Sequence, residues 1–376
     1  MLRAWRYRPG WFAVAASLLV APLLALCVVV LSGRGSPLPI ALDVLLGGLA
    51  CLAALAICLR RHVVAGVTCL LELSALLALV ASYRASPLQV PRRYSGNLPA
   101  ASPPSEMRAY RLSTGSNHRT AAFGYRGGSF SEPREFAMTA VLLRHPRGDL
   151  LIDTGFGARV AEQLASMPLG FRLSTAYTFT RSAAQQLTAA GYDTSRLRGV
   201  LLTHAHWDHV SGVADLGAVP VLVPRAEAQF VAHSGWIGDV ARSSGARFET
   251  YAFDGAPYLG FPSSHDLHGD GAIVVVPAPG HTPGSVVVFV TLPDARRYAF
   301  VGDLAWQLEG ITEREERPWL VRAMGDDDPA AVRENLLRMA ALHARFPELT
   351  LVPAHDPRGF ASFADLPEDR FPPATK

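Results

Sequence analysis

One short segment of the chain holds an unusual density of groups that bind metal ions. From Thr203 to His209 the sequence reads T-H-A-H-W-D-H, which places three imidazoles and one carboxylate close together. Zinc and related metals bind imidazole nitrogen and carboxylate oxygen, and a catalytic ion keeps one position open for water. Because residues two apart in an extended segment point the same way, His204 and His206 can reach one ion. Asp208 and His209, beyond a bend, can reach a second ion.

Three later residues can complete a site for two ions. Such a site needs a bridging carboxylate and two further imidazoles, and Asp303, His281 and His355 fit these roles. Two ions about 3.5–4 Å apart can hold a hydroxide between them and polarise a carbonyl or phosphoryl oxygen. The sequence therefore predicts a hydrolytic site with two divalent metal ions. Zinc (Zn2+) is the default, although iron, manganese or cobalt would also suit nitrogen and oxygen ligands.

Each ligand is expected to follow a β-strand. Apolar runs precede the first motif, His281, Asp303 and His355, at residues 199–202, 272–276, 298–301 and 349–352. Glycines at Gly280, Gly284 and Gly302 allow the backbone to approach the ions without a clashing Cβ. The ligands are therefore predicted on loops at the ends of strands.

Together these motifs resemble the pattern of the metallo-β-lactamase superfamily. H-x-H-x-D-H is followed by P-G-H-T-x-G, G-D and A-H, and Asp153-Thr154-Gly155 resembles the family's early D-T-G turn. The resemblance covers residues 108–360 and implies an α/β fold, an αββα sandwich with the site at one edge of its two sheets. It also implies the ligand sets, which are His204, His206 and His281 for the first metal, Asp208, His209 and His355 for the second, and Asp303 as the bridge.

Finer features favour one subgroup of the superfamily. Asp303 stands where antibiotic-hydrolysing members have Cys or Ser, and His206 stands where flavodiiron members have Glu. The ending His355-Asp356, preceded by a helix-like segment at residues 329–346, is most similar to the N-acyl homoserine lactonases. The resemblance implies a small-molecule substrate, an ester or lactone such as an acylated homoserine lactone, attacked by a metal-bridging hydroxide. Asp208 would pass a proton to the leaving alkoxide.

Other functions remain open at this point. The same pair of ions could hydrolyse a thioester or a phosphodiester. A non-catalytic membrane sensor built on a degenerate hydrolase domain is disfavoured, because no ligand position is missing. The formal net charge is only +3, the arginines are dispersed and Lys376 is the single lysine, so no nucleic-acid partner is expected.

Some polar residues are expected to support the site or to lie outside it. Asp153 is predicted to tether a ligand or cap a turn, and Asp356 to cap the turn that follows His355. Thr282 could donate a hydrogen bond to a ligand. His268, in a polar loop before a strand, is interpreted as a surface residue.

Three long apolar runs precede the catalytic part. Residues 11–31 contain no charge, residues 38–59 contain only Asp43, and residues 63–82 contain only Glu72. Each run is long enough to cross a hydrocarbon core of about 30 Å. The sequence therefore predicts a transmembrane region of about three helices within residues 1–85, with membrane lipid as a partner.

The arginines set the expected orientation of this region. Arg3, Arg6 and Arg8 precede the first run and an arginine pair separates the last two, which favours a cytoplasmic N-terminus. A multi-pass membrane location with an extracytoplasmic catalytic domain is therefore expected. Residues 86–106 are rich in Pro and Ser and are predicted to be a linker, and residues 107–376 to be one hydrolase domain.

Overall fold

The structure is a computed structural model and describes residues 62–90 and 93–367. The chain divides into two compact units. Among the described residues, the first comprises 62–84, 168–175 and 318–324, and the second comprises 85–90, 93–167, 176–317 and 325–367. In the first unit lie α3 (His62–Ser82), α6 (Leu169–Ser174) and most of α12 (Trp319–Gly325). All the predicted metal ligands belong to the second unit.

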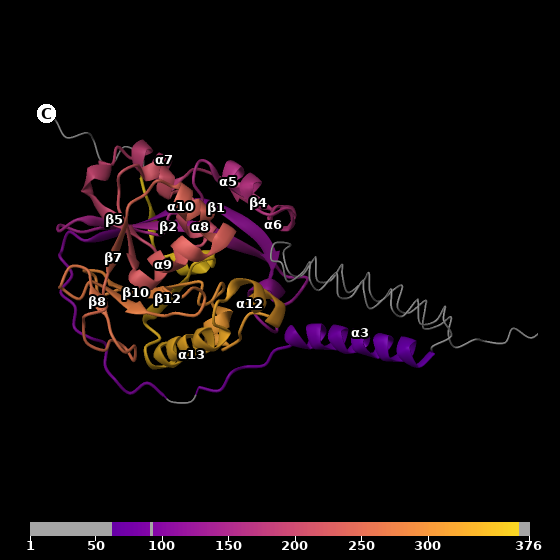
Figure 1. Cartoon of the computed structure of the whole chain (residues 1–376). Helices are drawn as coiled ribbons and strands as arrows, with labels where there is room; N and C mark the ends of the chain where they lie inside the picture. The colour runs from indigo at the N-terminus through magenta and orange to yellow at the C-terminus, as the bar shows by residue number, and fades with distance from the viewer. Residues whose placement is uncertain (1–61, 91–92, 368–376) are drawn as a thin grey trace, which may run out of the picture. The chain divides into compact units, whose positions relative to one another are not determined.

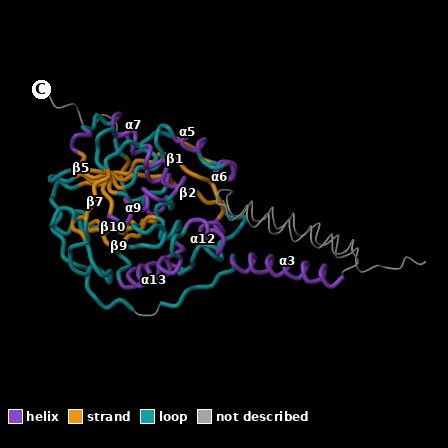
Figure 2. Tube along the Cα trace, in the orientation of Figure 1, coloured by secondary structure: helices purple, strands orange, loops and turns teal. Residues whose placement is uncertain are grey.

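Two β-sheets form the centre of the second unit (Figures 1 and 2). The larger sheet consists of β1 (Arg108–Thr120), β2 (Pro133–Arg144), β3 (Asp149–Ile152), β4 (Tyr177–Phe179), β5 (Leu197–Leu201), β6 (Val221–Pro224), β7 (Phe248–Tyr251) and β13 (Ala364–Asp365). The smaller sheet consists of β8 (His265–Asp266), β9 (Ile273–Pro277), β10 (Val286–Thr291), β11 (Arg297–Gly302) and β12 (Leu349–Pro353). The strand orders are β13-β1-β2-β3-β5-β6-β7, with β4 beside β1, and β12-β11-β10-β9-β8.

The inner faces of the two sheets share one hydrophobic core. Leu143 and Leu150 of the larger sheet pack in the same buried cluster as Val275, Val288 and Phe300 of the smaller sheet. Every residue of β3, β6 and β10 is buried, and all of them except Asp149 and Thr291 are apolar, as expected for strands covered on both faces. Each such aliphatic side chain contributes about 1.5–3 kcal/mol through burial. This core holds the strand ends from both sheets in fixed relative positions.

Helix α13 (Pro329–Arg345) covers the outer face of the smaller sheet. Asp328 caps it by accepting hydrogen bonds from the amides of Ala330 and Ala331, and a proline occupies its first turn. Its buried residues include Val332, Leu336 and Met339, whose helical spacing forms one apolar face that packs on β10 and β11. In Figure 1 the strands lie between α13 and α7 (Ala183–Ala189). The helix predicted at residues 329–346 is confirmed.

Short helical segments connect the remaining strands. They are α4 (Ala121–Gly124), α5 (Val160–Ser166), α8 (Trp207–Val210), α9 (Arg225–His233), α10 (Asp239–Ser243), α11 (Glu309–Thr312), η1 (Thr194–Arg196), η2 (Val213–Leu216), η3 (Gly235–Gly238) and η4 (Pro357–Phe360). Of these, α9 follows β6 directly and α8 follows β5 after residues 202–206, and both bring polar residues to the strand ends.

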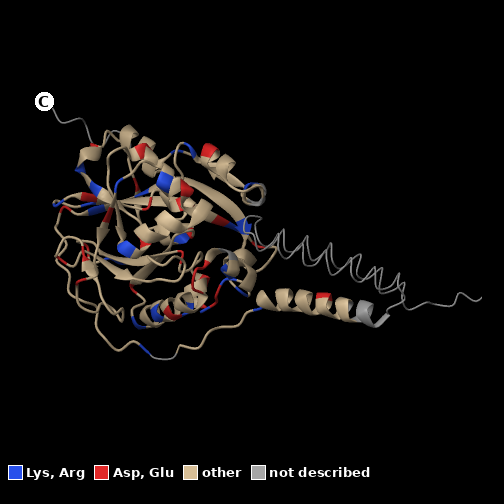
Figure 3. Ribbon diagram, in the orientation of Figure 1, with Lys and Arg blue, Asp and Glu red and all other residues tan. Residues whose placement is uncertain are grey.

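Acidic and basic residues are interspersed along the elements of the second unit (Figure 3). Arg358 in η4 binds Glu309 and Asp356, each at 2.6 Å, and Arg134 in β2 lies 3.0 Å from the same Glu309. The carboxylates of Glu309 and Asp356 are 13% and 0% exposed, so these pairs are better shielded from solvent than pairs on an open surface. These dispersed arginines therefore join α11, β2 and η4 within the chain.

The membrane-spanning helices that the sequence predicts are not supported. Within residues 62–90 and 93–367, no helix combines the length and the apolar character needed to cross a membrane. The third predicted span coincides with α3, which also carries Thr68, Glu72 and Ser74. The prediction rested on the length of each apolar run and on the number of charges in it. The other two predicted spans, residues 11–31 and 38–59, lie outside the described residues.

The sandwich and the membrane region that the sequence predicts have different outcomes. The α/β sandwich is present. No helix among the described residues could cross a membrane, which contradicts the transmembrane helices expected before the sandwich and removes the support for a multi-pass membrane location with an extracytoplasmic catalytic domain. The described residues likewise offer no support for membrane lipid as a partner. The linker at residues 86–106 and the domain at residues 107–376 stay predictions.

Candidate metal centre

The predicted ligands gather at strand ends of both sheets. The first four follow β5, with Asp208 and His209 inside α8, where the chain turns. His281 follows β9, Asp303 comes directly after β11, and His355 comes shortly after β12. All four strands that the sequence predicts before the ligands are present. The shared core of the two sheets therefore brings together residues that are far apart in the sequence.

The ligand atoms form two groups, each compact enough for one ion. Within each group these atoms lie no more than 4.8 Å from one another. The first group is His204, His206, His281 and Asp303, and the second is Asp208, His209 and His355. The partition of the histidines matches the two sets that the sequence resemblance implies.

The carboxylate of Asp303 faces both groups. Its Oδ2 atom lies 3.2 Å from Nε2 of His281 and 3.8 Å from Nε2 of His204. Its Oδ1 atom lies 3.1 Å from Nε2 of His355 and 3.3 Å from Nε2 of His209. A carboxylate with one oxygen toward each group has the arrangement that a bridging ligand between two cations requires.

Several buried atoms of these residues have no hydrogen-bond partner within the described chain. They are Nε2 of His204, His209 and His281, and Oδ1 of Asp303. An unsatisfied buried polar atom costs about 1–3 kcal/mol, so such atoms rarely converge without a ligand. Imidazole nitrogens together with carboxylate oxygens are the donor set that zinc and related divalent metals prefer. The residues therefore fit metal ions, and the cluster is a His/Asp metal site.

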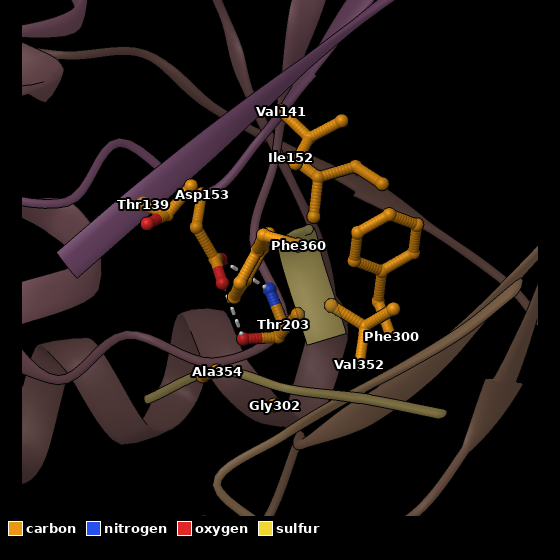
Figure 4. A pocket seen from close by; sticks show the side chains of 10 residues that line it. All are labelled: Thr139, Val141, Ile152, Asp153, Thr203, Phe300, Gly302, Val352, Ala354 and Phe360. Carbon is orange, nitrogen blue, oxygen red and sulfur yellow. Dashed lines mark hydrogen bonds between the residues drawn. The ribbon is translucent and has the colours of Figure 1, made fainter. Parts of the chain in front are cut away.

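Asp153 anchors the motif that follows β5. Its Oδ1 accepts a hydrogen bond from the Thr203 amide at 2.7 Å, and its Oδ2 accepts from the Thr203 hydroxyl at 2.8 Å (Figure 4). The same Oδ2 atom lies 2.9 Å from Nδ1 of His209. Asp153 has a φ of +51°, a left-handed conformation that Asp tolerates better than most residues. The prediction that Asp153 tethers a ligand is confirmed, and this contact orients the His209 ring.

A small cavity lies between Asp153, Thr203 and the core (Figure 4). Its volume is ≈ 10 Å³, and apolar side chains that include Ile152, Phe300 and Val352 close it on the core side. This is the space of about one water molecule. The cavity is therefore too small for a substrate.

A buried network that the sequence did not reveal supports the first group. Nδ1 of His281 lies 2.9 Å from Oδ1 of Asp326, and Arg317 binds the same oxygen. Arg317 also donates to the carbonyl oxygen of Asp303 at 2.6 Å, and its guanidinium lies 4.7 Å from the centre of the Trp306 ring. The Trp306 indole N–H in turn donates to Oδ2 of Asp303 at 2.7 Å. Arg317 thus lies between Asp326, which binds His281, and Trp306, which binds the carboxylate of Asp303.

Burial and charge set the protonation of the ligands. Burial, with the neighbouring imidazoles, holds the pKa values of His204 and His206 well below the usual histidine value, which favours the neutral form that binds metal. Burial also acts against charge on His209, yet the combined attraction of Asp153 and Asp303 raises its pKa well above the usual value. Although burial raises the pKa of Asp303, the surrounding histidines lower it well below its usual value. The lowered pKa favours the ionised carboxylate of Asp303, the form in which a carboxyl group binds metal.

The remaining expectations have mixed outcomes. Oδ1 of Asp356 accepts from the Arg358 amide at 3.0 Å and caps η4, as predicted. The Thr282 hydroxyl donates to the carboxylate of Glu227 at 2.7 Å and not to a ligand. His268 was expected at the surface, but it is 7% exposed because its ring stacks on His145 with the ring centres 3.9 Å apart. That interpretation was wrong.

The chain is similar to known proteins over the region that carries this site. The pattern of the metallo-beta-lactamase superfamily matches residues 134–355. A probable metallo-hydrolase of Mycobacterium tuberculosis is 32% identical over 230 residues, which covers 58% of this chain and 74% of the relative. The N-acyl homoserine lactonase AttM of Rhizobium radiobacter is 24% identical over 281 residues, which covers 70% of this chain and 98% of the relative.

Solved structures share the fold. The crystal structure of a quorum-quenching N-acyl homoserine lactone lactonase has a TM-score of 0.54 at 15% identity, covering 69% of this chain and 97% of that one. An N-acyl homoserine lactone hydrolase with N-hexanoyl-L-homoserine bound at its catalytic metal center has a TM-score of 0.55 at 15% identity, covering 69% and 98%. Because the family match spans more than half of the chain and includes both ligand groups, this protein belongs to the metallo-beta-lactamase superfamily and is a metal-dependent hydrolase.

Proposed function

We propose that this protein hydrolyses an ester or lactone with two divalent metal ions, and that the metal is zinc. The placement of Asp303 carries the proposal. Its two carboxylate oxygens lie 3.1–3.8 Å from Nε2 atoms of four histidines, two in each ligand group. This arrangement supports a pair of ions with a shared carboxylate between them. When bound, such a pair supplies a hydroxide at neutral pH and Lewis acidity toward a carbonyl oxygen.

The chain's own residues would hold and protect this geometry. The first metal position would be held by the rings of His204, His206 and His281. Asp326 orients the His281 ring through a hydrogen bond to its Nδ1 atom. His209 and His355 present theirs to the second position, with Asp153 behind His209. A ring held by a hydrogen bond at its far nitrogen keeps one tautomer and one orientation. The ligands would therefore need little rearrangement on loading.

Asp208 would be the catalytic residue. Its Oδ2 lies 3.5 Å from Nε2 of His355, so it stands at the edge of the second group. Its side chain is 14% exposed, whereas the side chain of Asp303 is 5% exposed. A carboxyl group at the solvent edge can give a proton to the leaving alkoxide and regain one from water. The opened lactone would leave as a hydroxy acid.

The lactone assignment draws on the relatives. AttM, named as an N-acyl homoserine lactonase, aligns with this chain over 98% of its own length. That similarity over nearly the whole relative supports an N-acyl homoserine lactone as the candidate substrate. The bridging Asp303 and the ending His355-Asp356 are in keeping with this choice.

The test is a substrate panel on full-length protein whose metal content is measured on the same sample. The panel holds N-acyl homoserine lactones, other lactones, aryl esters, thioesters and phosphodiesters. We expect the highest kcat/KM on a lactone or ester, and we expect Asp208→Ala to abolish turnover without loss of fold. Asp294→Ala, at an exposed turn, is the matched control. A protein that prefers thioesters or phosphodiesters, or an Asp208→Ala variant that keeps most of its activity, would contradict the proposal.

A further inference from the structure

A buried carboxylate joins the two loops that carry the histidines of the first group. Glu227, in the first turn of α9, has an exposed fraction of 0%. Its Oε1 accepts a hydrogen bond from the Ala205 amide at 2.5 Å. Its Oε2 accepts from the Thr282 hydroxyl at 2.7 Å and from the Gly284 amide at 3.0 Å. One side chain therefore binds both loops.

The two loops reach Glu227 from different sheets. Ala205 lies between His204 and His206, after β5 of the larger sheet. Thr282 directly follows His281, in the turn between β9 and β10 of the smaller sheet. A single ion can bind these histidines only if the loops keep a fixed separation, because metal–nitrogen bonds have a narrow range near 2.0–2.1 Å for zinc. The contacts of Glu227 fix that separation.

The packing around Glu227 is close. A Cβ placed on Gly284 would lie only 2.3 Å from the Glu227 amide nitrogen and 2.5 Å from its Cβ. Only glycine allows α9 to approach the second loop this closely. Burial raises the pKa of Glu227, and the three donors act in the opposite direction. Burying a carboxylate costs free energy, and hydrogen bonds from three donors offset part of that cost. These hydrogen bonds also fix the orientation of the Glu227 side chain.

We propose that Glu227 is a positioning residue for the first metal position. Its carboxylate holds the loop of His204 and His206 against the loop of His281 at the separation that one ion requires. The inference rests on the metal ligands of the proposed function but is independent of the substrate. Glu227 itself touches neither the ion nor the reacting atoms.

Glu227→Gln tests this role with almost no change of shape. The single amide oxygen cannot accept from both the Ala205 and Gly284 amides, so at least one loop loses its anchor. Full-length protein loaded with zinc would be dialysed against graded chelator, and zinc per chain would be measured. We expect one of two ions to leave at a chelator concentration about tenfold lower than in the wild type, the scale of supporting-residue effects on metal affinity. The second ion should leave as in the wild type.

Two further variants keep the test decisive. Glu162→Gln, exposed in the first turn of α5, is the matched control and should release zinc as the wild type does. Thr282→Val removes one donor and keeps the carboxylate, so it should cause a smaller selective loss, about two- to fivefold, even if Glu227→Gln does not fold.

The outcomes separate this inference from the proposed function. If wild-type protein binds two ions and the Glu227 and Thr282 variants release both as the wild type does, the positioning role is overturned while the proposed function stands. Loss of both ions together, in step with loss of folded protein, would mean that Glu227 only stabilises the fold. A wild-type protein that binds no zinc would instead overturn the proposed metal ligands.

Discussion

Oδ1 of Asp326 lies 2.9 Å from Nδ1 of His281, on the ring nitrogen opposite the one that faces Asp303. The Asp326 side chain is fully buried, so the contact is shielded from solvent. A carboxylate at Nδ1 holds the proton there and leaves Nε2 as a basic lone pair directed at the metal position. This relationship makes Asp326 part of the support of the first group, although it binds no metal itself.

We predict that Asp326→Asn weakens metal binding at the first position by about 10–100-fold. The amide can still accept a hydrogen bond, but it carries no charge to favour the required tautomer or to balance Arg317. The measurement is zinc affinity by competition with a chelator, together with kcat at saturating zinc. Asp327→Asn changes the adjacent, exposed residue and should leave both values unchanged. Equal affinities for Asp326→Asn and the wild type would contradict the role.

Arg317 should contribute to stability as well as to the site. Its side chain is 2% exposed and joins Asp326, the Asp303 carbonyl and the Trp306 ring. Arg317→Met leaves the buried carboxylate of Asp326 without its cation, and breaking a buried pair in this way costs about 3–5 kcal/mol. The free energy of unfolding in urea, measured with chelator present in both samples, checks this value. Arg345→Met, at the end of α13, is the control. A loss below about 1 kcal/mol would show that the network is dispensable.

The seven candidate ligands could be singled out from the sequence because their residue types and spacing are informative, and the fold brings them together in two groups. Histidines and aspartates at short spacing after apolar runs have few structural explanations, and each of the four expected strands is present. Asp326, Arg317 and Glu227 could not be predicted in this way. Asp326 is 45 residues from His281, and its type and setting are those of any polar residue before a helix. Only the fold brings such residues under the site.

The N-terminal prediction failed for a different reason. The third span was inferred from the length of an apolar run and from its few charges, whereas no helix of the described residues, α3 included, is both long and apolar enough to cross a membrane. His268 was misjudged because the sequence cannot show that its loop folds back onto His145.

The stacked pair of His145 and His268 should make stability depend on pH. Burial, followed by the positive charges of His145 and Arg198, lowers the pKa of His268 to about 4, while Asp270 acts against them. In the unfolded chain His268 therefore becomes protonated below about pH 6.5. In the folded chain it becomes protonated only near pH 4. Its contribution is fully present above pH 6.5 and is lost as the pH falls toward 4.

His268→Gln should remove this part of the acid sensitivity. We expect the Tm of the variant to fall less than that of the wild type between pH 6.5 and pH 4. The corresponding loss in the free energy of unfolding at pH 4 should be smaller in the variant by on the order of 1–2 kcal/mol. The histidines of the metal site titrate in both proteins, so the difference isolates His268. His118→Gln, at an exposed position in β1, serves as the control. Parallel Tm profiles for His268→Gln and the wild type would refute the prediction.

The central claim is that Asp303 lies between two cations held by the two groups. The most direct measurement is anomalous diffraction at the zinc edge from crystals of the zinc-loaded protein. We expect two peaks about 3.5–4 Å apart. One should lie beside Oδ2 of Asp303 with His204, His206 and His281, and the other beside Oδ1 with Asp208, His209 and His355. A single peak, or two peaks that Asp303 does not join, would contradict it.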